Sequence, residues 1–455
     1  MSQRTGEPTR ESVFAPPHRA LTVGVVLSVG TVAFESLGVA TVLPEVARRL
    51  DGLGAYGWGL SALMLANILG TVLAGRAADR GGARRPMAVG LLTFAAGCAL
   101  AGAATSWPLF LLGRFVQGLG VGAIMAMAYT AIGLTYPEHL RPRMYALLSS
   151  AWTVPSLVGP VLAGTLADHT SWRAVFLLIP PLVAVAALLV LPALPGGSGA
   201  PASRERGPLV AAVALTLGTA LFLQALLLDE LLPLTLLAAA GLAVAIPALR
   251  RVTPEGTLTA RRGIGSGIVI RALLCAVYFG SETYLPLGLQ EVRGLSVTEA
   301  SLGLSVGAIS WVAGAALQAR RDGTGTTRAR DVALGFGGLL AGVLLIGVAM
   351  LSDAVPAHLA TLGWAIGGLG MGMAFNASTT DTLEQALDRQ GEVSAALQLA
   401  QTLATAVLAG LGGAAVAFAG EGTDETRAAL LATFALTAVL ATLGTTLAGR
   451  LRPRP

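Results

Sequence analysis

Residues 75–85 read GRAADRGGARR, and this short charged stretch decides how the chain is organised. Long apolar segments lie directly before and after it. Four arginines and an aspartate in so short a run cannot rest in hydrocarbon, because the bilayer core holds no water to solvate them. We therefore expect residues 75–85 to form a polar loop at one face of a membrane, between two spanning helices.

The composition favours the same fold class. The chain has 455 residues, of which 54% are hydrophobic and 12% charged, and its mean hydropathy is +0.72. Soluble domains carry roughly twice that share of charged residues. The alternating strands of about ten residues that mark an outer-membrane barrel are absent from the sequence. The sequence therefore predicts an all-α membrane protein.

Fourteen segments are long and apolar enough to be transmembrane helices, since a spanning helix needs about 20 residues. They lie near residues 20–43, 57–76, 86–105, 108–131, 145–166, 173–192, 208–228, 232–249, 264–286, 299–318, 331–351, 357–377, 394–418 and 428–448. Most of the 30 basic residues, all of them arginine, fall in loops on the side of the N-terminus. Because such loops are normally cytoplasmic, we expect both termini in the cytoplasm. The use of arginine alone is typical of a GC-rich genome and favours a bacterial inner (plasma) membrane.

Two short motifs recur along the chain. The sequence GLS occurs at residues 59–61 and again at 303–305, and GLGxG occurs at 118–122 and again at 368–372. This spacing predicts two six-helix bundles related by a parallel repeat, at residues 20–192 and 264–448. The linker 193–263 would then hold two inserted transmembrane helices, with cytoplasmic tails at 1–19 and 449–455.

Several polar side chains fall inside the predicted spans, where an ionisable group is a candidate functional site. Glu35 lies nine residues before Pro44, and Arg114 and Gln117 share one later span. A structural bond to a neighbouring helix would also explain Glu35. Further candidates are Glu282, as a second titratable group or a wetted helix end, and Arg271, which we expect to snorkel. Polar groups that would line a cavity or bond across helices are Asn376, Gln398 and Gln401.

Taken together, these patterns resemble the major facilitator superfamily, and in particular its fourteen-helix drug:proton antiporter subfamily. An acid nine residues before a proline resembles the first-helix motif, although the subfamily usually has Asp where this chain has Glu35. Arg114 matches the fourth-helix motif that is linked to proton coupling. The charged stretch resembles the superfamily's signature between the second and third helices, which acts as a conformational latch. Its matching residues are Gly75, Asp79, Arg80, Gly82, Arg84 and Arg85.

Gly159, Pro160 and Gly164 resemble the antiporter motif of the fifth helix, which is associated with export. The resemblance implies a proton-coupled secondary transporter that exports small hydrophobic or cationic compounds by alternating access, as in multidrug efflux and antibiotic resistance. Glu35 would carry the proton with Arg114 as its partner, and Glu282 would be a second coupling group. The substrate cavity would include Glu35, Gln117, Asn376, Gln398 and Gln401.

Three other functions stay open at this point: a dedicated exporter of one endogenous product such as a lipid, siderophore or antibiotic, a non-transporting membrane scaffold or sensor, and an importer. A chain without lysine has no phosphate loop for ATP, so the energy source we expect is the proton gradient. We expect no enzymatic activity and no catalytic residue, metal, cofactor or nucleic-acid partner. The expected partners are a small-molecule substrate and the lipid bilayer, and the expected state is a monomer.

Overall fold

The computed structural model describes residues 12–137, 140–194, 207–228, 230–322, 327–352, 354–386, 390–420 and 422–452. Within these ranges the chain is helical and contains no strand. The first half comprises α1 (Pro16–Arg49), η1 (Leu53–Ala55), α2 (Trp58–Gly81), α3 (Arg84–Gly102), α4 (Trp107–Thr135), α5 (Arg141–Ser150), α6 (Thr153–His169), α7 (Trp172–Leu177) and α8 (Ile179–Ala193). The remainder comprises α9 (Gly207–Ala225), α10 (Leu231–Val252), α11 (Ile264–Leu287), the π-helical η2 (Gly288–Val292), α12 (Val297–Asp322), α13 (Arg328–Leu351), α14 (His358–Glu384), α15 (Gln390–Ala419), α16 (Thr423–Leu447) and η4 (Ala448–Arg450).

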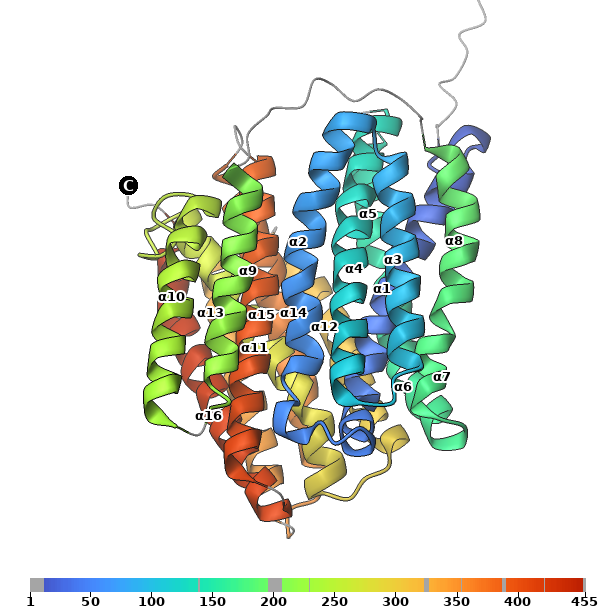
Figure 1. The fold of residues 1–455 in the computed structure, drawn as a ribbon. Helices are drawn as coiled ribbons and strands as arrows, with labels where there is room; N and C mark the ends of the chain where they lie inside the picture. The colour runs from blue at the N-terminus through green and yellow to red at the C-terminus, as the bar shows by residue number, and fades with distance from the viewer. Residues whose placement is uncertain are drawn as a thin grey trace, which may run out of the picture.

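Helix occurs at every predicted transmembrane segment, and the helices run side by side in one bundle (Figure 1). In the described part of the chain, eleven helices are long and apolar enough to cross a membrane. The segments at 145–166, 208–228 and 357–377 are outside that set, because α6 and α9 are short and α14 is rich in glycine. The count of fourteen spans therefore stays a prediction.

The predicted polar loop at residues 75–85 is largely helical, so that expectation was wrong. The second helix continues through Gly81 and the third begins at Arg84, which leaves Gly82 and Ala83 to connect them. Alanine and arginine are good helix formers, so helix extends past the apolar part of the segment. It ends at Gly82, whose φ of 76° and ψ of 173° suit a residue without Cβ.

Glycines of the repeated GLGxG motif let α4 and α14 approach their neighbours closely. A Cβ on Gly118 would lie 2.1 Å from the carbonyl oxygen of Leu63 in α2. At the matching position of α14, a Cβ on Gly368 would lie 2.3 Å from the carbonyl oxygen of Gly307 in α12. Close backbone contact of this kind is typical of helices packed in lipid. The two copies of the motif therefore make the same kind of backbone contact, one between α4 and α2 and the other between α14 and α12.

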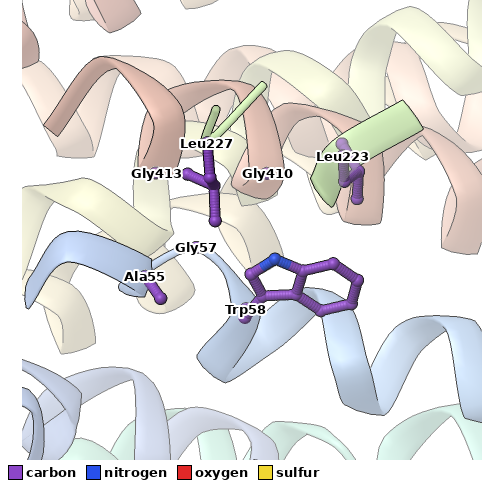
Figure 2. A pocket seen from close by; sticks show the side chains of 7 residues that line it. All are labelled: Ala55, Gly57, Trp58, Leu223, Leu227, Gly410 and Gly413. Carbon is purple, nitrogen blue, oxygen red and sulfur yellow. The ribbon is translucent and has the colours of Figure 1, made fainter. Parts of the chain in front are cut away.

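Helices α9 and α10 form a pair on one side of the bundle (Figure 1). The first of them packs against α2 and α15, and Figure 2 shows Leu223 of α9 and Leu227 across a narrow pocket from Trp58 of α2. The second carries large apolar side chains, such as Leu231 and Leu236, that are largely exposed. An exposed apolar helix face of this kind suits contact with lipid.

Contacts between residues 16–193 and residues 264–450 gather at one end of the bundle, where α1 and α11 finish and α2 and α12 begin. We call this end the joined end. Gln290 Nε2 donates to the carbonyl oxygen of Thr41 at 3.2 Å, and Tyr56 Oη donates to that of Thr283 at 3.1 Å. The carboxylate of Asp168, at the end of α6, accepts hydrogen bonds from Thr298 N and Oγ1 at 3.0 and 2.6 Å. Helices α1, α6, α11 and α12 thus hold the two halves together at this end.

Candidate functional site

A buried ion pair joins the first and fourth helices. Arg114 Nη1 of α4 donates to Glu35 Oε1 of α1, and both side chains are about 1% exposed. Two charges removed from water in this way are stable only while they remain paired and hydrogen-bonded. The structure therefore brings together the two residues that sequence analysis assigned to proton coupling.

Further hydrogen bonds fix the arginine and the carboxylate from two more helices. Arg114 Nε donates to the carbonyl oxygen of Gly59 in α2 at 2.8 Å, and Nη1 also donates to Gln117 Oε1 at 2.9 Å. Gln117 Nε2 in turn lies 3.2 Å from Glu35 Oε1 and 3.1 Å from Cys98 Sγ in α3. Gln117, which we expected to line the cavity, lies inside this network. The contact of Cys98 was not predicted, because in the sequence Cys98 is simply a cysteine within an apolar segment.

The two oxygens of the Glu35 carboxylate have different surroundings. Glu35 Oε2 is buried and has no hydrogen-bond partner in the part of the chain that the structure describes. A carboxylic acid carries its proton on one oxygen while the other still accepts a hydrogen bond. Glu35 can therefore take up a proton at Oε2 while Oε1 keeps its contact with Gln117, and the attraction to Arg114 then falls from charge–charge to charge–dipole.

A second buried arginine lies in the other half of the molecule. Arg271 of α11 is 4% exposed, so the expectation that it snorkels to the membrane surface was wrong. Its guanidinium lies 3.6 Å from the ring centroid of Phe375 in α14. Nη2 donates to Thr379 Oγ1, and Nη1 lies 3.4 Å from Gln401 Oε1 in α15. Helix packing holds this side chain inward because an aromatic ring and two neutral acceptors replace water around it.

The other polar candidates are not gathered into one site. Glu282 lies near the joined end of α11, half-buried, and makes no hydrogen bond or ion pair with the residues that the structure describes. Asn376 is half-buried on α14. On α15, Gln401 reaches Arg271, while Gln398, almost one turn earlier in the same helix, is exposed.

The latch and antiporter residues lie at opposite ends of the bundle. Arg80, Arg84 and Arg85 are exposed where α2 meets α3, at the same end of Figure 1 as the start of α1. Asp79 lies on α2, and its side chain is outside the described part of the structure. In α6, Gly164 is at the joined end, and a Cβ there would lie 2.3 Å from Ser301 Oγ of α12. Gly159 and Pro160 precede it in the same helix, where Gly159 has only ordinary contacts with α1.

Apolar helices that expose large side chains outward and bury charge inside define a multi-pass membrane protein. The sequence matches the model of the Major Facilitator Superfamily over residues 23–409, and the chain belongs to that superfamily. It is accordingly a transporter of small molecules and not an enzyme.

Curated relatives include efflux proteins. A probable multidrug-efflux transporter of Mycobacterium tuberculosis is 27% identical over 422 residues, which cover 88% of each chain. Multidrug resistance protein 3 of Bacillus subtilis is 27% identical over 169 residues, or 37% of this chain and 33% of that protein.

Solved structures share the fold at low identity. A bacterial homologue of the human lysosomal transporter Spinster, in an inward-facing and occupied conformation, superposes with a TM-score of 0.70 at 16% identity, covering 97% of this chain and 99% of that one. A D-xylose–proton symporter gives a TM-score of 0.68 at 14% identity, covering 95% and 98%. These likenesses show that the chain shares the overall fold of these two transporters.

Proposed function

We propose that this protein exports small hydrophobic compounds across a bacterial plasma membrane in exchange for protons. The observation that carries the proposal is the ion pair of Glu35 and Arg114, which is buried between helices of the first half. An unneeded charge pair in a membrane interior would be lost easily, since apolar residues of similar volume are often as stable. Efflux relatives over 88% of the chain support the direction of transport.

Protonation of Glu35 would act through α1. When the carboxylate is neutral, Arg114 keeps Gly59 and Gln117 as partners but loses its counter-ion. About 20 Å further along the same helix, at 1.5 Å per residue, Arg48 reaches the second half of the molecule. A change in how α1 is held by α4 is therefore transmitted to the joined end as a movement of one continuous helix.

Alternating access would consist of opening the joined end while the other end closes. In the described conformation the joined end is held by Asp168, Gln290 and Tyr56, which is the arrangement expected when a central site opens to the cytoplasm. We propose that residues 20–192 and 264–448 rock against each other in this way. The signature at residues 75–85 would hold the cytoplasmic end when it closes.

We propose fourteen transmembrane helices, both termini in the cytoplasm, and a monomer as the transporting unit. A proton-motive force of about 150 mV supplies roughly 3.5 kcal/mol per proton, which supports a gradient of a few hundred-fold. One proton per cycle at Glu35 would therefore suffice for useful efflux.

The experiment is a proton-release assay in everted membrane vesicles. A respiration-driven pH gradient is established, and neutral, cationic and acidic hydrophobic compounds are added in turn to vesicles with wild type, Glu35→Gln or Glu45→Gln. We expect at least one class to dissipate the gradient through wild type and Glu45→Gln, but not through Glu35→Gln. Glu45 is the matched control because it lies on the same helix and pairs at 2.9 Å with Arg49, whose side chain is 65% exposed. Equal proton release by all three proteins would contradict the role of Glu35.

A further inference from the structure

Arg271 is a buried cation without an acidic partner among the residues that the structure describes. Its side chain is 4% exposed, and its contacts in the described part of the chain are to the ring of Phe375, the hydroxyl of Thr379 and the amide oxygen of Gln401. Arg114, which is buried to the same degree in the other half, has Glu35 as its counter-ion. A buried guanidinium normally has a carboxylate or another anion beside it. The charge of Arg271 is therefore available to an anion from outside the chain.

The guanidinium also has donors to spare. It has five N–H donors in a planar fork, and Arg271 Nε makes no hydrogen bond with the residues that the structure describes. The contact between Nη1 and Gln401 Oε1 is long, at 3.4 Å. A carboxylate accepts two parallel N–H bonds from such a fork, and these are stronger than bonds to neutral oxygens. An incoming carboxylate would thus displace little and gain two charge-assisted hydrogen bonds.

The side chains around this group are partly exposed. Phe375, Thr379 and Gln401 surround the guanidinium and are each only half-buried. They come from α14 and α15, and Arg271 lies in the first third of α11, away from the joined end. A ligand that reaches these side chains from the end of the bundle opposite the joined end needs to move only one layer of side chains to touch Arg271.

Aromatic rings continue from the arginine toward the joined end. The ring of Phe375 lies 5.4 Å from that of Trp311 in α12, and Trp311 lies 5.0 Å from Tyr278 in α11. Phe375 and Trp311 are half-buried, while Tyr278 is buried against Trp364 at 4.4 Å. Such rings offer faces and edges to an aromatic ligand. A cation at one end and half-buried rings beside it match a ligand with an acidic end and an aromatic body.

We propose that the transported substrates include aromatic carboxylates, and that Arg271 binds their carboxylate while Phe375 and Trp311 contact the ring system. This inference rests on the proposed function and names its substrate class. From the sequence we expected hydrophobic or cationic compounds, with Glu35 as a contact. In the structure, however, the charge of Glu35 is already neutralised by Arg114. Glu282 lies about 16 Å along α11 from Arg271, at 1.5 Å per residue, and so belongs to a different part of the molecule.

Three fluorescent probes that differ only at one end test the inference: 1-pyrenebutyrate, the neutral 1-pyrenebutanol and the cationic 1-pyrenebutylamine. Equilibrium binding to the purified full chain in detergent is measured for wild type, Arg271→Gln and Arg173→Gln. Arg173 is the matched control, because it too lies over an aromatic ring, at 4.2 Å from Trp172, and donates to a carbonyl oxygen at 2.7 Å. Thermal unfolding of each variant establishes that it is folded.

We expect wild type to bind the carboxylate at least tenfold more tightly than the alcohol. Arg271→Gln should lose at least tenfold for the carboxylate while its affinity for the alcohol changes less than twofold, and Arg173→Gln should change neither. Equal losses for carboxylate and alcohol in Arg271→Gln, or tighter binding of the amine by wild type, would overturn the inference.

The same probes separate this inference from the proposed function. Binding in detergent needs no gradient, so Glu35→Gln should bind 1-pyrenebutyrate as wild type does. If Arg271 discriminates the probes but Glu35→Gln still exchanges protons, the proposed coupling fails and the carboxylate site stands. If Glu35→Gln abolishes proton exchange but Arg271→Gln binds all three probes as wild type does, the carboxylate site fails and the proposed coupling stands.

Discussion

Arg48, in the last turn of α1, forms an ion pair with Glu291 in the π-helical turn that follows α11, with 2.8 Å between Nε and Oε1. The pair links the helix that carries Glu35 to the second half of the molecule. Its side chains are 48% and 24% exposed, so water screens part of the attraction. We therefore regard it as one of several weak links that together hold the joined end.

A double-mutant cycle at this pair should show a small coupling that favours the closed joined end. Exposed pairs contribute about 0.2–1 kcal/mol, so Arg48→Gln or Glu291→Gln should shift the balance between closed and open states by no more than about fivefold. The readout is the rate at which an impermeant maleimide labels Ser61→Cys, whose parent side chain is buried at this end. Labelling should rise in each single variant and no further in the double variant. If the increase in labelling rate in the double variant equals the product of the increases in the two single variants, the two residues are not coupled.

Gly164→Ala should open the joined end more strongly. A Cβ at this position would lie 2.3 Å from Ser301 Oγ and 3.1 Å from Thr298 Cα, so α6 and α12 must move apart. Overpacking of this kind costs roughly 1–3 kcal/mol in the state that holds the contact. We expect faster maleimide labelling of Ser61→Cys in this background. Gly159→Ala is the matched control, since its nearest contact would be an ordinary 3.5 Å from Phe34; equal labelling in both variants would count against a glycine contact between the halves.

Arg114→Gln should destabilise the protein more than the double variant Glu35→Gln/Arg114→Gln does. The single change leaves a carboxylate buried without its cation, which costs about 3–5 kcal/mol, whereas the double change leaves neutral amides that hydrogen-bond each other. Thermal unfolding in detergent measures this difference. Arg173→Gln, which removes an arginine without an acidic partner in the described structure, controls for loss of a guanidinium. A double variant less stable than Arg114→Gln would contradict the paired arrangement.

Gly82→Ala should weaken the connection between α2 and α3. The residue adopts φ 76° and ψ 173°, which a residue with Cβ reaches only under strain of order 1–3 kcal/mol. We expect a lower unfolding temperature and slower transport. Gly75→Ala, within α2 and with no atom within 4 Å of an added Cβ, should instead leave stability unchanged or slightly higher. If both variants unfold at the temperature of wild type, the strain at Gly82 has no energetic consequence.

Much of the fold could be predicted because the relevant signals are long. Runs of about 20 apolar residues indicate helices whatever their neighbours are, and helix occurs at each predicted segment. The ends of the helices were predicted less well. Helix α2 runs on through the charged residues up to Gly81, because alanine and arginine favour helix after the apolar pattern stops. Similarly, α1 begins at Pro16, four residues before the expected start.

The candidate site was predicted in part. Glu35 and Arg114 stand out in sequence because charge is rare inside spans, but their contact depends on how α1 and α4 are rotated, which no local pattern gives. The same dependence on helix rotation explains why the burial of Arg271 was not predicted. Near a helix end it could have snorkelled, and only the packing of α14 and α15 shows that Phe375 and Gln401 hold it inside.

The central claim is that Glu35 couples proton movement to transport, and substrate transport with and without a pH gradient in proteoliposomes tests it most directly. A substrate found in the vesicle assay is loaded on one side, and its uptake is followed first by exchange at equal pH and then under an imposed pH gradient. The account predicts that Glu35→Gln retains exchange at equal pH and loses accumulation driven by the gradient, while Glu45→Gln retains both. Gradient-driven accumulation by Glu35→Gln at the wild-type level would contradict it.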